Sequence, residues 1–362
     1  MVQNNKKIYF ELMRILACGL VIFNHLKGYS LYSMSNGIKQ FIYMCLTMIT
    51  RVNVPLFFMI SGALLLKKDE DIIFILKKRI LRIALVLFLF EGIALTACNL
   101  IAIKSGQEFE YTINRYLNVV LGNNLNVTGA YWYLYAYLGF LFMLPFMQRV
   151  AKKFTKAEFI MLLIVHFVVS SFIPLWNVIG DMVGFQPVQL CSDFVVPFAF
   201  TKAFFYPLIG YYLENNIDVR KFRGGTAIRL IFIGLVGILL SNLCTYYEAS
   251  NTGYYTQNYV QLFDYLTAIV AFLTIKALTV IIIDKDHKIQ AMKKIEFMGS
   301  LTFGIYLFDP ILQEILYHRY EMIVEPMLPT LIVSFGWVMI SMLCGGVLTY
   351  IMKKLPGIRK LL

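Results

Sequence analysis

Long apolar runs, each separated from the next by a short polar stretch, recur along the whole chain. An α-helix needs about 20 apolar residues to cross roughly 30 Å of hydrocarbon. The runs therefore predict ten membrane-spanning helices and an all-α, polytopic membrane bundle. They cover residues 8–27, 39–66, 80–103, 131–150, 157–176, 194–214, 227–246, 260–283, 297–318 and 327–352.

Composition supports a membrane protein over a water-soluble globule. Hydrophobic residues make up 59% of the chain and charged residues only 15%, against about 25% charged in ordinary soluble domains. We find no repeat, no low-complexity tract and no loop long enough to fold alone. We therefore expect one transmembrane domain over residues 1–362, with no attached soluble domain.

The distribution of basic residues predicts the orientation, because short cytoplasmic loops carry the excess of Lys and Arg. With the N-terminus inside, 24 of the 33 basic residues fall on the cytoplasmic side, among them Lys6 and Lys7, and five fall outside, among them Lys27. Both termini are thus expected in the cytoplasm. The net charge of +12 then faces anionic membrane lipid, and nucleic acid is not an expected partner.

The six cysteines are scattered and form no C-x-x-C pair. Neither a disulfide framework nor a metal site is predicted.

Two titratable residues, Arg14 and His25, lie inside the first apolar run. A charge costs several kcal/mol in hydrocarbon and persists there only when it faces protein or a wet cavity. In a helix, a separation of eleven residues places both side chains on one face. Glu11, one turn before Arg14, shares that face and is a candidate partner for it.

The second run contains an arginine, an amide, a proline, two aromatics and a Ser-Gly pair. Pro55 is expected to bend the helix, and the Ser-Gly pair permits close approach of another backbone or of a ligand. Packing alone is one explanation of this pattern, but the charge of Arg51 requires a partner or a cavity. The candidate residues are Arg51, Asn53, Phe57, Phe58, Ser61 and Gly62.

Arg79 and Arg82 enter the third run three residues apart. They share a helical face, and their forked donors suit a phosphate group. A cytoplasmic flank of positive charge is the simpler alternative.

The fourth run opens with the aromatic residues Trp132, Tyr133 and Tyr135. Such clusters usually anchor a helix at the membrane interface, although they also suit the lining of a pore.

The ninth run contains Tyr306 and the buried carboxylate of Asp309. Asp309 needs a cation, for which Arg14, Arg51 and His25 are the candidates; this pairing is either structural or part of catalysis. Four further intramembrane polar residues are interpreted as satisfied structural groups unless a polar cavity includes them. They are Glu91, His166, Lys202 and Lys276.

Taken together, these elements resemble the acyltransferase-3 family of bacterial integral-membrane acyltransferases. The likeness rests on Arg14-x10-His25 with Glu11, V-P-L-F-F-M-I-S-G in the second run, Arg79-x-x-Arg82, and W-Y-L-Y from Trp132. G-Y-Y-L at Gly210 and G-I-Y-L at Gly304 extend it over nearly the whole chain. The chain is most similar to the surface-polysaccharide O-acyltransferase subgroup.

The resemblance implies an O-acetyltransferase in the bacterial plasma membrane. Acetyl-CoA or another acyl-CoA would be a donor substrate rather than a permanently bound cofactor, and the acceptor would be a hydroxyl of a cell-surface or lipid-linked glycan. His25 is the expected general base, and Arg14, Glu11 and Asp309 are the other candidate catalytic residues. We expect the donor's phosphates at Arg79 and Arg82 and its pantetheine arm in a cavity lined by the first, second and ninth runs, with Phe57, Phe58, Ser61 and Gly62 among the donor-binding residues.

In one respect the chain departs from the family. Its members often have a histidine before the proline of the ninth run, where this chain has Asp309. The role of that position is therefore open.

A transporter or flippase is the main alternative, because intramembrane Arg, His, Asp and Lys also describe a substrate pathway. Against it, the two halves of the chain show no matching pair of interrupted helices. A membrane sensor or scaffold is a third alternative, which is disfavoured because we expect no soluble signalling domain in the chain.

Overall fold

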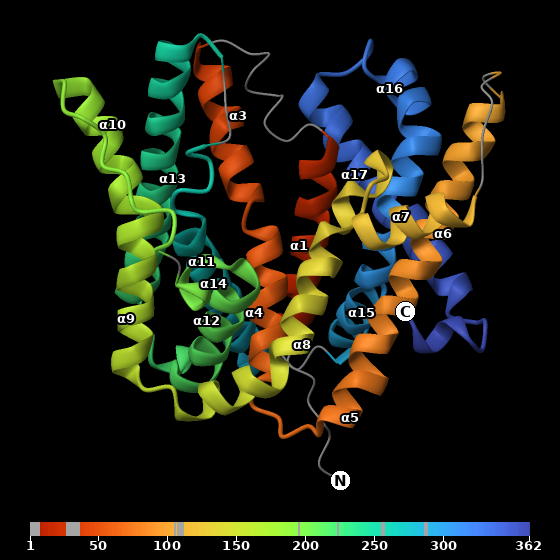
Figure 1. The fold of residues 1–362 in the computed structure, drawn as a ribbon, viewed down its shortest axis with the longest axis horizontal. Coiled ribbons are helices and arrows are strands. Elements are labelled where there is room, and N and C mark those ends of the chain that lie inside the picture. The colour runs from red at the N-terminus through yellow and green to blue at the C-terminus, as the bar shows by residue number, and fades with distance from the viewer. Residues whose placement is uncertain are drawn as a thin grey trace. The chain divides into compact units, whose positions relative to one another are not determined.

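The computed structural model describes residues 8–26, 37–104, 106, 112–194, 196–222, 224–254, 258–285 and 289–362. Within these ranges every regular element is helical (Figure 1), which confirms the all-α prediction. Lys6, Lys7 and Lys27 lie outside the described residues. The elements are α1 (Ile8–Leu26), α3 (Gly37–Thr50), α4 (Asn53–Leu65), α5 (Ile72–Phe74), η1 (Ile75–Ile80), α6 (Leu81–Lys104), α7 (Ile113–Gly122), η2 (Asn126–Tyr131), α8 (Trp132–Lys153), α9 (Lys156–Phe167), η3 (Val168–Phe172), α10 (Ile173–Val183), α11 (Pro197–Phe200), α12 (Lys202–Asn216), η4 (Val219–Lys221), α13 (Gly224–Thr252), α14 (Asp264–Lys285), α15 (Ile289–Leu312), η5 (Gln313–Tyr317), α16 (His318–Val324), α17 (Thr330–Met352) and η6 (Ile358–Lys360).

Each of the ten predicted spans corresponds to helix. Among the described residues, eight helical stretches are long and apolar enough to cross a membrane. The remaining two predicted spans are the helices α12 and α14. The protein is therefore a multi-pass membrane protein.

Large apolar side chains point outward from several of these helices. On α13, Ile228, Phe232 and Leu235 are 70%, 65% and 57% exposed, and Leu239 and Leu243 continue the stripe. Soluble proteins rarely expose apolar patches of this size. Such a surface is stable when lipid covers it.

Two local features differ from the predictions. The second span is interrupted at Arg51 and Val52, between α3 and α4, and Pro55 lies in the first turn of α4. Proline is tolerated there because the first N–H groups of a helix have no intrahelical partner. The expected external loop before residue 131 contains α7, whose N-cap Thr112 accepts a hydrogen bond from the backbone N–H of Arg115.

The chain divides into two compact units, each built from separated segments. The first unit comprises residues 1–20, 27–69 and 146–293, and the second comprises residues 21–26, 70–145 and 294–362. The single-domain organisation expected over residues 1–362 stays a prediction.

In the first unit, α4 packs closely against α12. A Cβ atom at Gly62 would overlap the backbone of Pro207, and one at Gly210 would overlap the backbone of Met59. The two glycines therefore allow the helix backbones to touch. In the same unit, α10 lies beside α13 (Figure 1).

The second unit contains the last residues of α1 together with α6, the first part of α8, most of α15, and α17. Phe23 stacks on Phe335 of α17, with ring centroids 5.1 Å apart. Phe90 of α6 meets Phe308 of α15 edge to face at 5.1 Å. These contacts hold the end of α1 and the end of α15 within one packed core.

Candidate active site

His25 and Asp309 form a hydrogen-bonded pair inside the second unit. His25 lies in the last turn of α1, and its Nδ1 is 3.0 Å from Oδ2 of Asp309 on α15. The Asp309 side chain is fully buried, whereas that of His25 is 21% exposed. Arg14, Arg51 and His25 were the candidate partners for Asp309, and the structure places His25 beside it.

Two further side chains hold the Asp309 carboxylate. The hydroxyl of Ser341 donates to Oδ1 at 2.8 Å, and the amide of Gln313 donates to Oδ2 at 3.0 Å. A buried carboxylate is stable only when such donors replace the water that it has lost. Asp309 is therefore held in a single orientation toward His25.

The backbone around Asp309 is irregular. Pro310 lies inside α15 and cannot donate a hydrogen bond to the preceding turn. Gln313 then begins the π-helical turn η5, and such turns are frequent at functional sites. The Gln313 amide that donates to the carboxylate thus lies at the junction between α15 and this irregular turn.

This geometry assigns a role to each nitrogen of the His25 ring. A carboxylate can only accept, so Nδ1 carries the hydrogen and Nε2 is the acceptor of the neutral ring. A histidine oriented by a carboxylate in this way can take a proton from a hydroxyl at Nε2 and is stabilised when it becomes charged.

Aromatic residues surround α15 near this pair. The hydroxyl of Tyr131 donates to the carbonyl of Leu307 at 2.5 Å, and that of Tyr306 donates to the carbonyl of Ala130 at 2.6 Å. The rings of Tyr133 and Tyr306 meet edge to face at 6.1 Å. These contacts join the beginning of α8 to the helix that carries Asp309.

The other aromatic candidates have different surroundings. Trp132 is 43% exposed, as expected for a ring at the membrane interface. Tyr135 donates to the carbonyl of Val120 at 2.6 Å and lies 3.4 Å from Glu91. Glu91 is fully buried and accepts from Thr128 at 2.6 Å, in agreement with its interpretation as a satisfied structural group.

Arg14 and Glu11 form the predicted pair within the first unit, with 2.6 Å between Nη1 and Oε1. Arg51 lies in the turn between α3 and α4, and the buried Asn53 begins α4. The structure thus gives Arg14 the partner Glu11.

The remaining second-span candidates contribute to packing in α4. Phe58 is fully buried, and the Ser61 hydroxyl donates to the carbonyl of Phe57 at 2.8 Å. The group that approaches Gly62 closely is the backbone of α12. Contact between the acyl donor and Phe57, Phe58, Ser61 or Gly62 stays a prediction.

Arg79 and Arg82 lie in the second unit and have separate partners. Arg79 forms a two-pronged pair with Glu70, in which both N–O distances are 2.5 Å. Arg82 donates to the carbonyls of Leu361 and Leu362 at 2.9 and 3.4 Å.

Two further groups lie close to Arg82: the ring of Phe303 and the ammonium of Lys353. Arg79, Arg82 and Lys353 are called the basic cluster below. The Arg82 guanidinium lies over the ring of Phe303 on α15, 5.7 Å from its centre. Lys353, directly after α17, donates to the carbonyl of Ser300 at 2.6 Å. Burial, and to a smaller extent the charge of Arg82, lowers the pKa of Lys353.

Sequence reasoning did not single out Gln313, Ser341 or Lys353 as site residues. The position of Gln313 four residues after Asp309 is a usable signal, because such residues are neighbours on a helix. Ser341 lies on α17 and Lys353 directly after it. Only the tertiary structure brings Ser341 to Asp309 and Lys353 to Arg82.

Comparison with known proteins identifies the family of the chain. No curated protein and no solved structure matches the chain. The model of the acyltransferase-3 family, described as an acyltransferase domain, matches residues 7–351. Because this match covers nearly the whole sequence, the chain belongs to the acyltransferase-3 family and is a membrane-embedded acyltransferase.

Proposed function

We propose that this protein is an O-acetyltransferase of the bacterial plasma membrane. It transfers an acetyl group from cytoplasmic acetyl-CoA to a hydroxyl of a cell-surface or lipid-linked glycan. The observation that carries the proposal is the His25–Asp309 pair, a partly exposed histidine held by a fully buried carboxylate.

His25 acts as the general base in this proposal. Its Nε2 removes the proton from the acceptor hydroxyl as the hydroxyl oxygen attacks the thioester carbonyl carbon. The carbon–sulfur bond then breaks, and the imidazolium returns the proton to the departing thiolate of coenzyme A. Asp309 stabilises the charged ring between these two steps.

The donor's phosphates bind to Arg79, Arg82 and Lys353. Forked guanidinium groups suit phosphate oxygens, and Lys353 adds a third positive charge. The helix α15 connects this cluster to the base, because Phe303 lies under Arg82 and Asp309 follows six residues later. At 1.5 Å per residue, that separation is about 9 Å along the helix.

The orientation predicted from the basic residues supports this arrangement. With both termini in the cytoplasm, Arg79 and Arg82 face the compartment that holds acyl-CoA, whereas His25 lies toward the outer end of α1. The donor then enters from inside, and the acceptor hydroxyl reaches His25 from outside.

The test is release of free coenzyme A by the purified protein, supplied with acetyl-CoA and an extract of bacterial surface glycans. We expect release together with acetylated glycan from the unaltered chain, and loss of both in His25→Ala. His318→Ala, a change at an exposed histidine of α16, serves as the matched control and should retain activity.

Two outcomes would overturn the proposal. One is coenzyme A release that is unchanged in His25→Ala. The other is movement of an intact saccharide across a vesicle membrane without consumption of acetyl-CoA, which would favour a transporter.

A further inference from the structure

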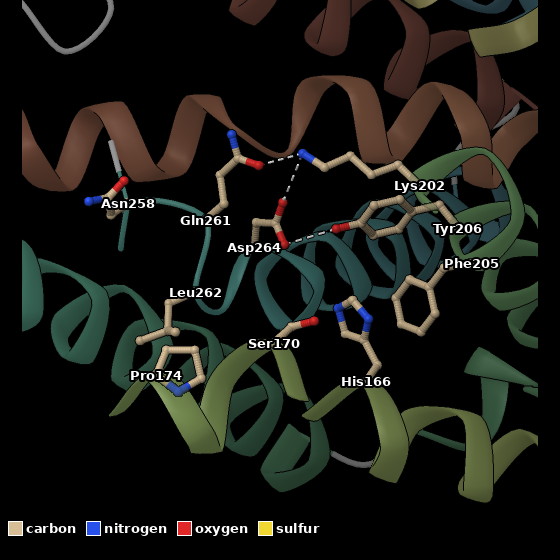
Figure 2. Close-up of a pocket in the computed structure, with 10 residues that line it drawn as sticks. All are labelled: His166, Ser170, Pro174, Lys202, Phe205, Tyr206, Asn258, Gln261, Leu262 and Asp264. Carbon is tan, nitrogen blue, oxygen red and sulfur yellow. Dashed lines mark hydrogen bonds and ion pairs between the residues drawn. The ribbon is translucent and has the colours of Figure 1, made fainter. Parts of the chain in front are cut away.

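The first unit contains a polar pocket of about 220 Å³, and none of its lining residues has a part in the proton transfer or phosphate binding proposed above (Figure 2). His166 of α9, Lys202 and Tyr206 of α12, and Gln261 and Asp264 near the start of α14 line it. His166 and Lys202 were expected to be structural groups unless a polar cavity included them, and this cavity includes both.

The charges in this pocket balance one another. Lys202 Nζ lies 3.8 Å from Oδ2 of Asp264 and donates to the Gln261 side-chain oxygen at 2.5 Å. The Tyr206 hydroxyl donates to Oδ1 of Asp264 at 2.9 Å. Figure 2 shows these groups pointing toward one another across the pocket. With one cation and one anion, the wall attracts neither a free anion nor a free cation.

His166 contributes a hydrogen-bond acceptor to the pocket. Its Nδ1 is 2.5 Å from the carbonyl of Ala199, and a carbonyl can only accept, so Nδ1 carries the hydrogen. Nε2 of the neutral ring is then an acceptor. Stacking on Phe205, with ring centroids 3.9 Å apart and planes at 16°, holds the ring in this orientation.

The backbone around the pocket is also specialised. Ser170 lines the pocket from the π-helical turn η3, a kind of turn that is frequent at functional sites. The neighbouring Ser171 hydroxyl donates to the carbonyl of Leu262 at 2.6 Å. This bond ties η3 to the segment before α14, and both segments line the pocket.

We infer that this pocket binds one uncharged sugar residue of the acceptor. A sugar ring carries several hydroxyls, each both donor and acceptor, and the pocket offers an ammonium, a carboxylate, an amide, a hydroxyl and an imidazole to pair with them. At about 220 Å³, it is smaller than the roughly 300–1,000 Å³ that drug-sized ligands occupy. The assignment of this sugar to the acceptor rests on the proposed function, whereas the binding itself does not.

Other ligand classes fit the pocket less well. The Asp264 carboxylate, 7% exposed, repels an anionic group, and Lys202 repels a cationic one. An apolar ligand would leave the polar groups of the pocket without water, which costs free energy for each group. The ligand is therefore neutral and polar.

The test is equilibrium binding of glucose, galactose, N-acetylglucosamine and, for comparison, glucuronate to the purified full-length protein. We expect at least one neutral sugar to bind and glucuronate to bind at least tenfold more weakly. Asp264→Asn and Lys202→Met should each weaken binding of the neutral sugar at least tenfold. Gln261→Glu keeps the shape of the side chain but adds a charge, and it should also weaken binding at least tenfold. It provides a variant outside the Lys202–Asp264 pair.

The controls separate this inference from the proposed function. Lys152→Met and Asp69→Asn alter an exposed ion pair of the same unit and should leave sugar binding unchanged. His25→Ala should bind sugar normally while releasing no coenzyme A. Sugar binding without His25-dependent release would remove the proposed function and leave the pocket assignment intact.

Three results would overturn the inference. They are no binding of any neutral sugar to the unaltered protein, preferential binding of glucuronate, and unchanged sugar binding in all three pocket variants. Each variant is first required to elute as a single folded species, so a loss of binding reports on the pocket.

Discussion

At the scale of single residues, Asp309 orients the proposed base through one carboxylate oxygen and is itself held by Ser341 and Gln313. In Asp309→Asn a neutral amide can still accept from Nδ1 but cannot stabilise the imidazolium. We expect kcat to fall by roughly two orders of magnitude, the lower range for general acid–base catalysis. Ser341→Ala removes one supporting bond and should reduce kcat about tenfold at most.

The measurement for this pair of variants is steady-state release of coenzyme A at saturating acetyl-CoA, with folding checked by gel filtration. An Asp309→Asn protein that retains the full kcat would show that the carboxylate only stabilises the fold.

A second prediction at the residue scale concerns Glu70. Its carboxylate accepts from the two Arg79 guanidinium donors that we propose for binding a phosphate of acetyl-CoA. Glu70→Gln should lower the KM for acetyl-CoA several-fold, because it removes a negative charge that competes with the phosphate. Arg79→Ala should raise this KM about tenfold. Asp71→Asn is the matched control, since Asn caps the short helix α5 as well as Asp does.

Initial rates over a range of acetyl-CoA concentrations give both constants. A raised KM in Glu70→Gln would contradict competition and indicate that Glu70 positions Arg79 for binding.

At the scale of elements, the contact between α4 and α12 depends on two glycines. Gly62→Ala should destabilise the protein by about 1–3 kcal/mol, the usual range for overpacking, because the new Cβ meets the backbone of Pro207. Gly139→Ala on α8 is the control. Apart from its chain neighbours and its own helix backbone, none of the described residues has an atom within 4 Å of its Cβ position, so this variant should be neutral or slightly stabilising.

Thermal unfolding in detergent, followed as loss of the folded species, compares the two alanine variants. Equal midpoints would mean that α4 and α12 can move apart without loss of stability.

A second prediction at this scale concerns the end of α12. Lys276 pairs with Glu214 at 3.0 Å and donates to the carbonyls of Leu213, Glu214 and Ile217. Lys276→Met leaves the buried Glu214 without its cation, for which a loss of about 3–5 kcal/mol is typical. The double variant Lys276→Met/Glu214→Gln should regain part of this stability.

The same unfolding assay tests the pair. If the double variant is less stable than Lys276→Met alone, the stability lost in Lys276→Met does not come from leaving the buried Glu214 charge unpaired.

At the scale of the whole molecule, the orientation in the membrane can be tested with a native residue. Among the described cysteines, Cys191 alone is exposed, and the predicted topology places it in an external loop. A membrane-impermeant maleimide should therefore label Cys191 in intact cells, and Cys191→Ser should abolish that labelling. Labelling that requires permeabilised cells would reverse the orientation and place Arg79 outside.

Several features could be predicted from the sequence because they depend on residues close together in the chain. Apolar length predicts the spans, and spacing predicts the pairing of Glu11 with Arg14 within one turn. The family could also be predicted, because short motifs along most of the chain each carry part of the resemblance. The break at Arg51 was less predictable, since Pro55 is equally compatible with a bend and with the first turn of a new helix.

The sequence by itself determined that the chain is helical, crosses the membrane many times and carries titratable groups within its apolar spans. Each of these properties depends on local composition and periodicity. Only the tertiary structure decided which groups meet. Three cations were candidates for Asp309, and the packing of α1, α15 and α17 placed His25 and Ser341 beside it. The partners lie 284 and 32 residues away in the chain, so helix packing rather than helical spacing determines the pairing.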